Sequence, residues 1–212
     1  MELTQNPSVL ELVRKTAELT TPKEIVWIDG SEAQLESLRK IAVETGELIK
    51  LNEEKLPGCY LNRSDVNDVA RVEGRTFICS RTREEAGPTN NWMDPDEMKA
   101  KLHEILRCAM AGRTMYVIPY SMGVIGSPFA KYGIEVTDSI YVVLNMAIMT
   151  RIGTKVLDAL GDSSDVILGV HSKVTLDPEN RYIVHFPEEN KIISVNSNYG
   201  GNVLPVSYTH LT

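Results

Sequence analysis

The sequence has few cysteines, no excess of positive charge and no apolar run long enough to cross a membrane. Its three cysteines, Cys59, Cys79 and Cys108, are odd in number and irregularly spaced, which fits neither a disulfide framework nor a zinc cluster. Reduced thiols and a cytoplasmic location are therefore expected. The 22 Lys and Arg residues against 29 Asp and Glu give a net charge of −7 and a pI near 5.2, which argues against a nucleic-acid partner.

A membrane partner is not expected either. The longest apolar stretch, residues 140–149, is interrupted by Asn145 and is about half the length that a membrane-spanning helix needs. The first residues lack the basic and apolar regions of a secretion signal.

What the sequence does contain is the pattern of an ordinary globular protein, with 42% hydrophobic and 24% charged residues. Apolar residues at helical spacing alternate with short β-branched and aromatic runs that end near glycine. Ser31 stands three residues before Gln34 as a capping box, and Asp94 precedes Pro95 as the cap of a later helix. The predicted helices are residues 7–19, 32–45 and 93–110; the predicted strands are 24–29, 76–79, 114–118, 181–186 and 191–195, the last two forming a hairpin. These elements predict a mixed α/β fold.

The densest functional signal lies between Arg113 and Ser139. There the predicted strand 114–118 is followed by a Gly/Ser/Pro-rich loop, residues 119–128, and loops at strand ends often hold ligand sites in α/β proteins. A structural connection is the alternative. Ser121 in this loop is not part of a G-x-S-x-G nucleophile elbow, and no Walker-type phosphate loop occurs in the chain. Residues 81–91 are predicted to form a surface loop.

Two further segments are candidates for binding. The pair Gly200-Gly201 lets the main chain approach a ligand closely, and Tyr199 before it offers a ring and a hydroxyl, although an ordinary turn is the alternative. Arg71, at the end of a short helix predicted to begin at Ser64, has the geometry to bind a carboxylate or phosphate, with a surface salt bridge as the alternative. His103, His171 and His185 are far apart in sequence and are interpreted as structural.

Several segments, in the same order, resemble the GTP-dependent phosphoenolpyruvate carboxykinase family. They are Asp29-Gly30-Ser31-Glu32, DVARVEGRTFI from Asp68, RTMYVIPYSMGVIGSP from Arg113, GIEVTDSIYVV from Gly133, MTRIGTKVLDALGD from Met149 and YGGN from Tyr199. Together they cover essentially residues 20–202. The resemblance implies an α/β fold with a mixed β-sheet flanked by helices, as in the N-terminal domain of that family.

The resemblance also implies a function: the interconversion of oxaloacetate and phosphoenolpyruvate in gluconeogenesis, with decarboxylation and phosphoryl transfer from GTP. Arg71 matches the family's substrate-binding arginine, and Tyr199, Gly200 and Gly201 match its substrate loop. The cofactors implied are GTP/GDP and Mn²⁺ or Mg²⁺. Their ligands, and the catalytic residues, are expected beyond this chain. The implied protein is a cytoplasmic enzyme, monomeric in its full-length form, that acts on a small molecule.

The chain departs from the family in length and at its C-terminal end. Family members are much longer, so residues 1–202 are expected to be an incomplete N-terminal domain. Residues 203–212 are expected to be a foreign tail, because they contain no lysine where the family has a metal-binding lysine. The 212-residue chain alone is predicted to be inactive. The alternatives are a non-enzymatic domain that binds a small carboxylate, and a kinase-like or hydrolytic enzyme that uses the loop around Ser121.

Overall fold

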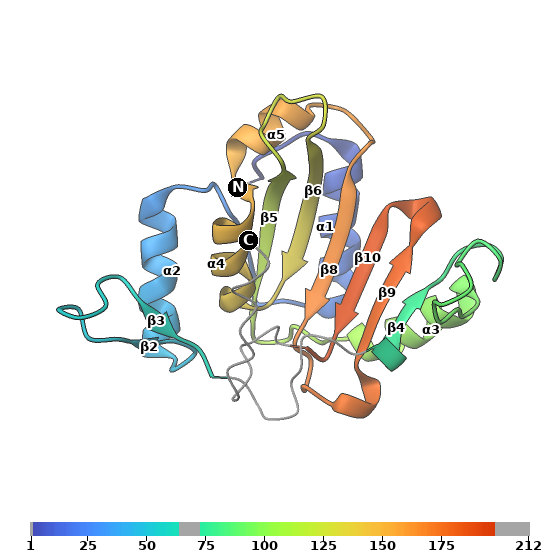
Figure 1. The fold of residues 1–212 in the computed structure, drawn as a ribbon, viewed down its shortest axis with the longest axis horizontal. Helices are drawn as coiled ribbons and strands as arrows, with labels where there is room; N and C mark the ends of the chain where they lie inside the picture. The colour runs from blue at the N-terminus through green and yellow to red at the C-terminus, as the bar shows by residue number, and fades with distance from the viewer. Residues whose placement is uncertain (1, 64–72, 198–212) are drawn as a thin grey trace.

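Eight strands form one large mixed sheet through the centre of the structure (Figure 1). The computed structural model describes residues 2–63 and 73–197. The strands of the sheet are β1 (Glu24–Trp27), β4 (Thr76–Ile78), β5 (Thr114–Met122), β6 (Lys131–Thr137), β7 (Arg151–Ile152), β8 (Ile167–Ser172), β9 (Tyr182–Phe186) and β10 (Lys191–Val195). Their order across the sheet is β1-β5-β6-β8-β10-β9-β4, and β7 pairs with β5. A separate two-stranded sheet joins β2 (Ile49–Lys50) to β3 (Tyr60–Leu61).

Three neighbouring strands in the middle of the large sheet run in the same direction. Strand β8 pairs in parallel with β6 on one side and with β10 on the other. Their carboxyl ends therefore lie at one edge of the sheet, which is the lower edge in Figure 1. Strands β5 and β9 run antiparallel to their neighbours β6 and β10, so both begin at this same edge. Strand β4 runs parallel to β9 and begins there too.

Helices cover both faces of the sheet. Neighbouring strand residues point to opposite faces, and in β5 Val117 lies in one apolar core whereas Tyr116 lies in the other. The Val117 core is formed with α1 (Pro7–Thr20) and α3 (Pro95–Leu106), and the Tyr116 core with α2 (Glu32–Glu44) and α4 (Ile140–Met149). The short helix α5 (Thr154–Leu160) follows β7. The predicted α/β fold with a mixed sheet flanked by helices is confirmed.

The N-caps predicted at Ser31 and Asp94 are present, but the capping box predicted for Ser31 and Gln34 is only half formed. The side chain of Gln34 accepts the N–H of Asp29, and the N–H of Ser31 donates to Asp29 instead. One predicted helix is also too long. Ser31 accepts a hydrogen bond from the backbone N–H of Gln34, and Asp94 accepts two at the start of α3. The helix predicted over residues 93–110 ends at Leu106. Beyond it, the N–H groups of Cys108 and Met110 donate to backbone carbonyls at the end of α1, and Cys108 has a φ of 55°. These bonds to α1 replace the bonds that would continue the helix.

The loop predicted over residues 119–128 is wrong for its first part. Strand β5 continues to Met122 and pairs with β6 over its whole second half, with Pro119 opposite Ile134. Proline lacks an N–H, which normally excludes it from an inner strand. Here the carbonyl of Pro119 faces Gly153 and accepts its N–H. The side of β5 on which Pro119 lacks an N–H therefore faces β7 and Gly153. There Gly153 needs only an acceptor, which the Pro119 carbonyl supplies.

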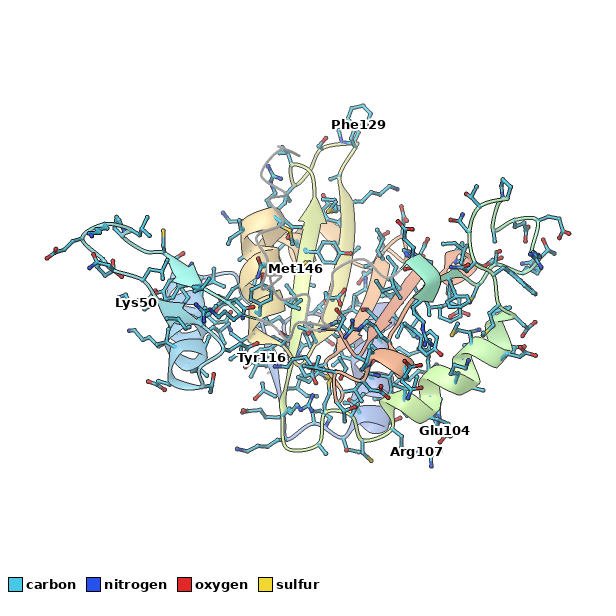
Figure 2. The ribbon with its side chains drawn as sticks, turned by 60° about the horizontal axis from the view of Figure 1, so that its bottom comes forward. Lys50, Glu104, Arg107, Tyr116, Phe129 and Met146 are labelled. Carbon is cyan, nitrogen blue, oxygen red and sulfur yellow. The ribbon has the colours of Figure 1, made fainter. Side chains whose placement is uncertain are left out.

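The tip between β5 and β6 is the part of the predicted loop that remains a turn. Phe129 at this tip is 89% exposed and points away from the body of the domain, as Figure 2 shows. Residues 81–91 form turns without a helix or strand, as predicted, and β9 and β10 form the predicted hairpin. The predicted short helix that begins at Ser64, and the segment 203–212, lie outside the described residues. In the described part of the chain, no helix has the length and apolar character needed to cross a bilayer.

Candidate functional site

Polar side chains gather where β6, β8 and β10 end. Thr137 ends β6 and is followed by Asp138 and Ser139. His171 and Ser172 end β8 and are followed by Lys173, and Asn196 and Ser197 follow β10. The carboxyl ends of parallel strands are the usual place for ligand sites in open α/β sheets. We therefore take this row of strand ends as the candidate functional site. We call it the carboxyl edge, which means the side of the sheet where β6, β8 and β10 end and not an outermost strand.

A buried carboxylate ties three strands together at the carboxyl edge. The side chain of Asp138 is fully buried and lies 2.6 Å from Nη1 of Arg113, which precedes β5. It also accepts hydrogen bonds from the hydroxyl of Ser172 at 3.0 Å and the backbone N–H of Lys173 at 2.9 Å. Arg113 in turn donates to the carbonyl of Val174. A buried charge needs such partners, and this network fixes the segment that follows β8 against the start of β5.

A second network connects β6, β8 and the residues after β10. Nδ1 of His171 lies 2.7 Å from the hydroxyl of Thr137, which also accepts the backbone N–H of Ser139 at 3.1 Å. The other ring nitrogen of His171, Nε2, hydrogen-bonds the backbone carbonyl of Ser197. His171 is only 1% exposed and Ser197 2%. A buried imidazole thus joins two strands to the chain segment that leaves the sheet.

Asn196 forms a third set of contacts at the same edge. Its φ of 62° turns the chain out of the β10 direction. Its side-chain oxygen accepts the N–H groups of Thr175 and Asp177, and its amide donates to the carbonyl of Asn180. Its own carbonyl accepts Nε of Arg181 at 3.0 Å. The backbone between β10 and Ser197 is therefore held by neighbouring segments on both sides.

A cavity of about 540 Å³ opens beside the Asp138 network. Three cationic side chains, those of Arg63, Arg113 and Lys173, line it together with Glu47, whose carboxylate lies 3.5 Å from Nζ of Lys173. The other lining residues are Thr45, Gly46, Asn62, Val174, Thr175 and Leu176. The side chains of Arg113 and Lys173 are partly exposed. Three cations line the cavity, although Arg113 is already paired with Asp138 and Lys173 with Glu47. An excess of positive groups suits a small anion.

A second cavity, of about 430 Å³, lies between α2, α4 and the β2–β3 hairpin. The cation that lines this cavity, Arg39, is already paired with Glu32 and Glu36, which lie on the same helix, α2. Apolar groups such as Leu144 and Ile148 form part of its wall. The carboxyl edge therefore offers more charged groups for a small anionic ligand than this cavity does.

The four predicted binding residues, Arg71, Tyr199, Gly200 and Gly201, lie outside the described residues. The described residues that flank them all lie at the carboxyl edge. Arg63 lines the cavity on one side of residues 64–72, and on the other side Arg75 contacts the Tyr182 hydroxyl at the start of β9. Ser197, directly before the second undescribed segment, is held by His171.

Ser121 lies within β5 and not in a loop. Its side chain is fully buried, and its hydroxyl donates to the carbonyl of Gly123 at 3.3 Å. A nucleophilic serine needs a base within hydrogen-bonding reach, and this hydroxyl is directed at a backbone carbonyl instead. The geometry counts against a hydrolytic or kinase-like function for Ser121.

Two of the three histidines among the described residues lie away from the carboxyl edge. His103 is exposed on α3, beside Glu104. His185 is half-buried on β9, and this burial lowers its pKa. His171 is the buried member of the carboxyl edge, in keeping with its interpretation as a structural residue. The part that Asp138, Arg113 and Asn196 play there was not predicted from the sequence. The signal available was the run of polar residues after β6 and β8, TDS and HSK.

The described residues do not fit a divalent metal. Over residues 2–63 and 73–197, no three His, Cys, Asp or Glu side chains are close enough to share a metal ion. The buried carboxylate of Asp138 already has three donors around it. No step that involves a metal is therefore assigned to these residues.

The fold and the carboxyl edge together define an α/β domain with a polar site at the ends of parallel strands. The family model described as "Phosphoenolpyruvate carboxykinase N-terminal domain" matches residues 11–208, and the chain belongs to this family.

Named relatives agree with this assignment. The chain is 53% identical to "Phosphoenolpyruvate carboxykinase [GTP]" of Anaeromyxobacter dehalogenans (strain 2CP-C), over 95% of this chain and 34% of that protein. It is 50% identical to the protein of the same name from Neocallimastix frontalis, over 94% of this chain and 35% of that protein. The match to the Corynebacterium kroppenstedtii protein of that name is also 50%, over 95% and 34%. The chain therefore spans about a third of the length of these relatives.

Proposed function

We propose that this chain is the N-terminal part of a GTP-dependent phosphoenolpyruvate carboxykinase, which interconverts oxaloacetate and phosphoenolpyruvate in gluconeogenesis. The observation that carries the proposal is the 53% identity, over 95% of the chain, to a protein named phosphoenolpyruvate carboxykinase [GTP]. The carboxyl edge supports it, because the described residues that flank the predicted substrate-binding residues lie there.

Four residues are proposed to bind the substrate. The guanidinium of Arg71 suits a carboxylate or phosphate oxygen pair, because its planar fork donates two parallel charge-assisted hydrogen bonds. Gly200 and Gly201 let backbone N–H groups come close to the substrate, and Tyr199 adds a ring and a hydroxyl. Their contribution is positioning and charge neutralisation, since phosphoryl transfer requires little covalent chemistry from the protein.

The remaining parts of the reaction are assigned to residues beyond this chain. GTP/GDP and Mn²⁺ or Mg²⁺ are proposed to bind to the longer part of the enzyme. The 212-residue chain alone is proposed to be inactive. The complete enzyme is proposed to be a cytoplasmic monomer that acts on small molecules, without a nucleic-acid or membrane partner.

A chimaeric enzyme tests the proposal. Residues 1–202 of this chain are joined to the remaining two thirds of the Anaeromyxobacter dehalogenans relative, and GTP-dependent formation of phosphoenolpyruvate from oxaloacetate is measured. The chimaera should be active, and Arg71→Ala should lower kcat/KM for oxaloacetate about a hundredfold, the effect of losing about 3 kcal/mol of charge-assisted binding.

Arg14→Ala is the matched control, because Arg14 is exposed on α1 and pairs only with Glu18 on the same helix among the ion pairs of the described residues. It should leave kcat/KM unchanged. Activity of Arg71→Ala at the level of the unsubstituted chimaera would contradict the proposed role of Arg71. An inactive chimaera, with phosphoenolpyruvate still bound by the 212-residue chain, would favour a non-enzymatic carboxylate-binding domain.

A further inference from the structure

Cations from three separate segments of the chain line the cavity beside the Asp138 network. Arg63 lies after β3, Arg113 directly before β5 and Lys173 directly after β8. Among the described residues that line the cavity, Glu47 carries the one carboxylate. The volume of about 540 Å³ is in the range of small-molecule sites in proteins. The cavity therefore has the size of a ligand site and an excess of positive charge.

Two of these cations have donors that the described part of the chain leaves free. Nζ of Lys173 lies 3.5 Å from the Glu47 carboxylate, which is long for a hydrogen bond, since N–H···O distances are usually about 2.9–3.0 Å. Arg63 is exposed, and its guanidinium forms no ion pair with a carboxylate in the described part of the chain. Arg113 is different, because it is held 2.6 Å from the buried Asp138. Lys173 and Arg63 are thus the groups most available to a ligand.

The end of α2 offers a structural reason for the positive charge, since Thr45 and Gly46 follow this helix and line the cavity. The carboxyl end of a helix attracts cations. However, the carbonyls of Ile41, Ala42 and Val43 already accept N–H groups from the residues that follow the helix. The two free cations are therefore not required to satisfy these carbonyls.

The cavity wall that carries Lys173 is held in an unusual conformation. Val174 has a φ of 46° and Leu176 a φ of 59°, in the left-handed region that residues other than glycine rarely adopt. Such a conformation persists only where neighbouring groups enforce it. Here Asp138 accepts the N–H of Lys173, and Asn196 accepts two N–H groups further along the same segment. The backbone beside the cavity is therefore fixed before any ligand arrives, which lowers the entropic cost of binding.

We propose that this cavity binds a phosphate group, either as inorganic phosphate or as part of a small phosphate monoester. Arg63 and Lys173 donate charge-assisted hydrogen bonds to it, and Arg113 adds a third positive charge. The oxygens of a phosphate point to several sides, which suits cations from separate segments, whereas a planar carboxylate is satisfied by one guanidinium fork. The proposal is independent of the proposed function, because it uses none of the four residues that are proposed to bind the substrate.

The experiment titrates inorganic phosphate into the 212-residue chain at constant ionic strength and follows the backbone amide signals of Gly46 and Thr175 by NMR. Both residues line the cavity, so their signals should shift as phosphate binds. Arg63→Gln and Lys173→Gln should each weaken binding about tenfold, the effect of losing one charge-assisted hydrogen bond. Glu47→Gln should strengthen binding about threefold, because it removes the negative charge that competes with phosphate for Lys173.

Opposite effects of the Lys173 and Glu47 substitutions separate a ligand site from a structural ion pair, because loss of either partner would break such a pair alike. Lys155→Gln is the matched control and should leave binding unchanged. Lys155 is exposed on α5, which follows β7, and β7 pairs with the end of β5 that is far from Arg113. Thermal unfolding shows whether each variant retains the fold. Arg63→Gln, at an exposed position, keeps the test valid if Lys173→Gln does not fold.

Glycerol 3-phosphate, titrated in the same way, distinguishes the two sources of a phosphate group. Tighter binding than that of inorganic phosphate assigns the site to a monoester. Weaker binding assigns it to the free ion.

Three results would overturn the proposal. Phosphate that shifts neither the Gly46 nor the Thr175 signal does not enter the cavity. Unchanged affinity in both Arg63→Gln and Lys173→Gln would show that these cations do not bind it. Binding that is lost in Arg71→Ala but kept in those two variants would assign phosphate to the residues proposed for the substrate, which would support the proposed function and overturn this inference.

Discussion

The ring of Tyr120 on β5 lies against the backbone of Gly133, its direct partner on β6. A Cβ added at Gly133 would lie 2.3 Å from Cζ and 2.5 Å from the hydroxyl oxygen of Tyr120. Tyr120 is only 9% exposed, and burial raises the pKa of its hydroxyl to about 12. Glycine is therefore required at position 133, because any side chain there would overlap the ring of Tyr120.

Gly133→Ala should lower the free energy of unfolding by about 1–3 kcal/mol, because the buried Tyr120 ring must move to make room. Urea unfolding measures the loss. Gly74→Ala is the control, since no atom of the described residues other than its chain neighbours lies within 4 Å of a Cβ at that position. In a Tyr120→Leu background the alanine should cost less, because the ring that it meets is gone. The same cost in both backgrounds would show that Tyr120 is not the obstacle.

Glu135 should make the protein less stable as the pH rises. Burial raises the pKa of its carboxyl from the usual 4.5 to about 8. Between these two values the folded protein holds a proton that the unfolded chain releases. The contribution of Glu135 is therefore fully present below pH 4.5 and is lost as the pH rises through 8, with a slope of at most about 1.4 kcal/mol per pH unit.

Glu135→Gln removes this titration, so the variant should gain stability relative to the unsubstituted protein as the pH is raised from 5 to 9. Urea unfolding at several pH values measures the difference. The exposed Glu54→Gln serves as the control and should follow the profile of the unsubstituted protein. A constant difference between Glu135→Gln and the unsubstituted protein across this range would contradict the raised pKa.

Loss of the negative charge of the buried Asp138 side chain should strongly destabilise the folded protein. In Asp138→Asn an amide N–H₂ would face either the guanidinium of Arg113 or the N–H of Lys173, and two donors cannot satisfy one another. Breaking a buried pair costs about 3–5 kcal/mol, and the partial exposure of Arg113 reduces this to about 2–4 kcal/mol. Denaturant unfolding checks it, with the exposed Asp162→Asn as control. Surface substitutions usually change the free energy of unfolding by less than about 0.5 kcal/mol. A change that small for Asp138→Asn would contradict the prediction.

Asn6→Asp should destabilise the protein, although aspartate is usually as good a helix N-cap as asparagine. Its side-chain oxygen accepts the N–H groups of Ser8 and Val9, while its amide donates to the carbonyls of Gly161 and Ser163. Asn6→Asp keeps the cap but turns a carboxylate toward two carbonyls. We expect a loss of about 2 kcal/mol, since each hydrogen bond contributes about 1 kcal/mol.

The corresponding exchange at the start of α3 provides the comparison for Asn6. Asp94 accepts from Asp96 and Glu97. Asp94→Asn should therefore change the free energy of unfolding by only a few tenths of a kcal/mol. Equal effects of the two exchanges, measured by urea unfolding, would show that the bonds of Asn6 to Gly161 and Ser163 do not contribute.

Local signals in the sequence predicted the local structure well. The caps at Ser31 and Asp94 depend on residues three positions apart or fewer, and both are present. The end of the 93–110 helix could not be predicted, because it depends on bonds from Cys108 and Met110 to the distant helix α1. Pro119 was misinterpreted for a similar reason, since only the position of Gly153 makes a proline acceptable in β5.

The carboxyl edge was beyond prediction from local patterns. Asp138 is 25 residues from Arg113, and Thr137 is 34 residues from His171. Nothing in the spacing of these residues indicates that they meet, because the contact depends on the strand order β5-β6-β8. The predicted roles of Arg71, Tyr199, Gly200 and Gly201 stay predictions, since these residues lie outside the described ones.

The position of β4 has a consequence for how the chain is made. Strand β4 is the outermost strand on one side of the sheet, and among the described strands it pairs only with β9. Arg75, directly before β4, and Tyr182, the first residue of β9, are 107 residues apart in sequence. At a synthesis rate of 5–20 residues per second, β4 leaves the ribosome roughly 5–20 s before the strand that receives it. During that time the backbone groups of β4 that face β9 have no sheet partner, although the N–H of Ile78 already has one in the carbonyl of Asn91. The side of residues 76–78 that faces β9 is therefore open to mispairing and to chaperone binding until β9 has been synthesised.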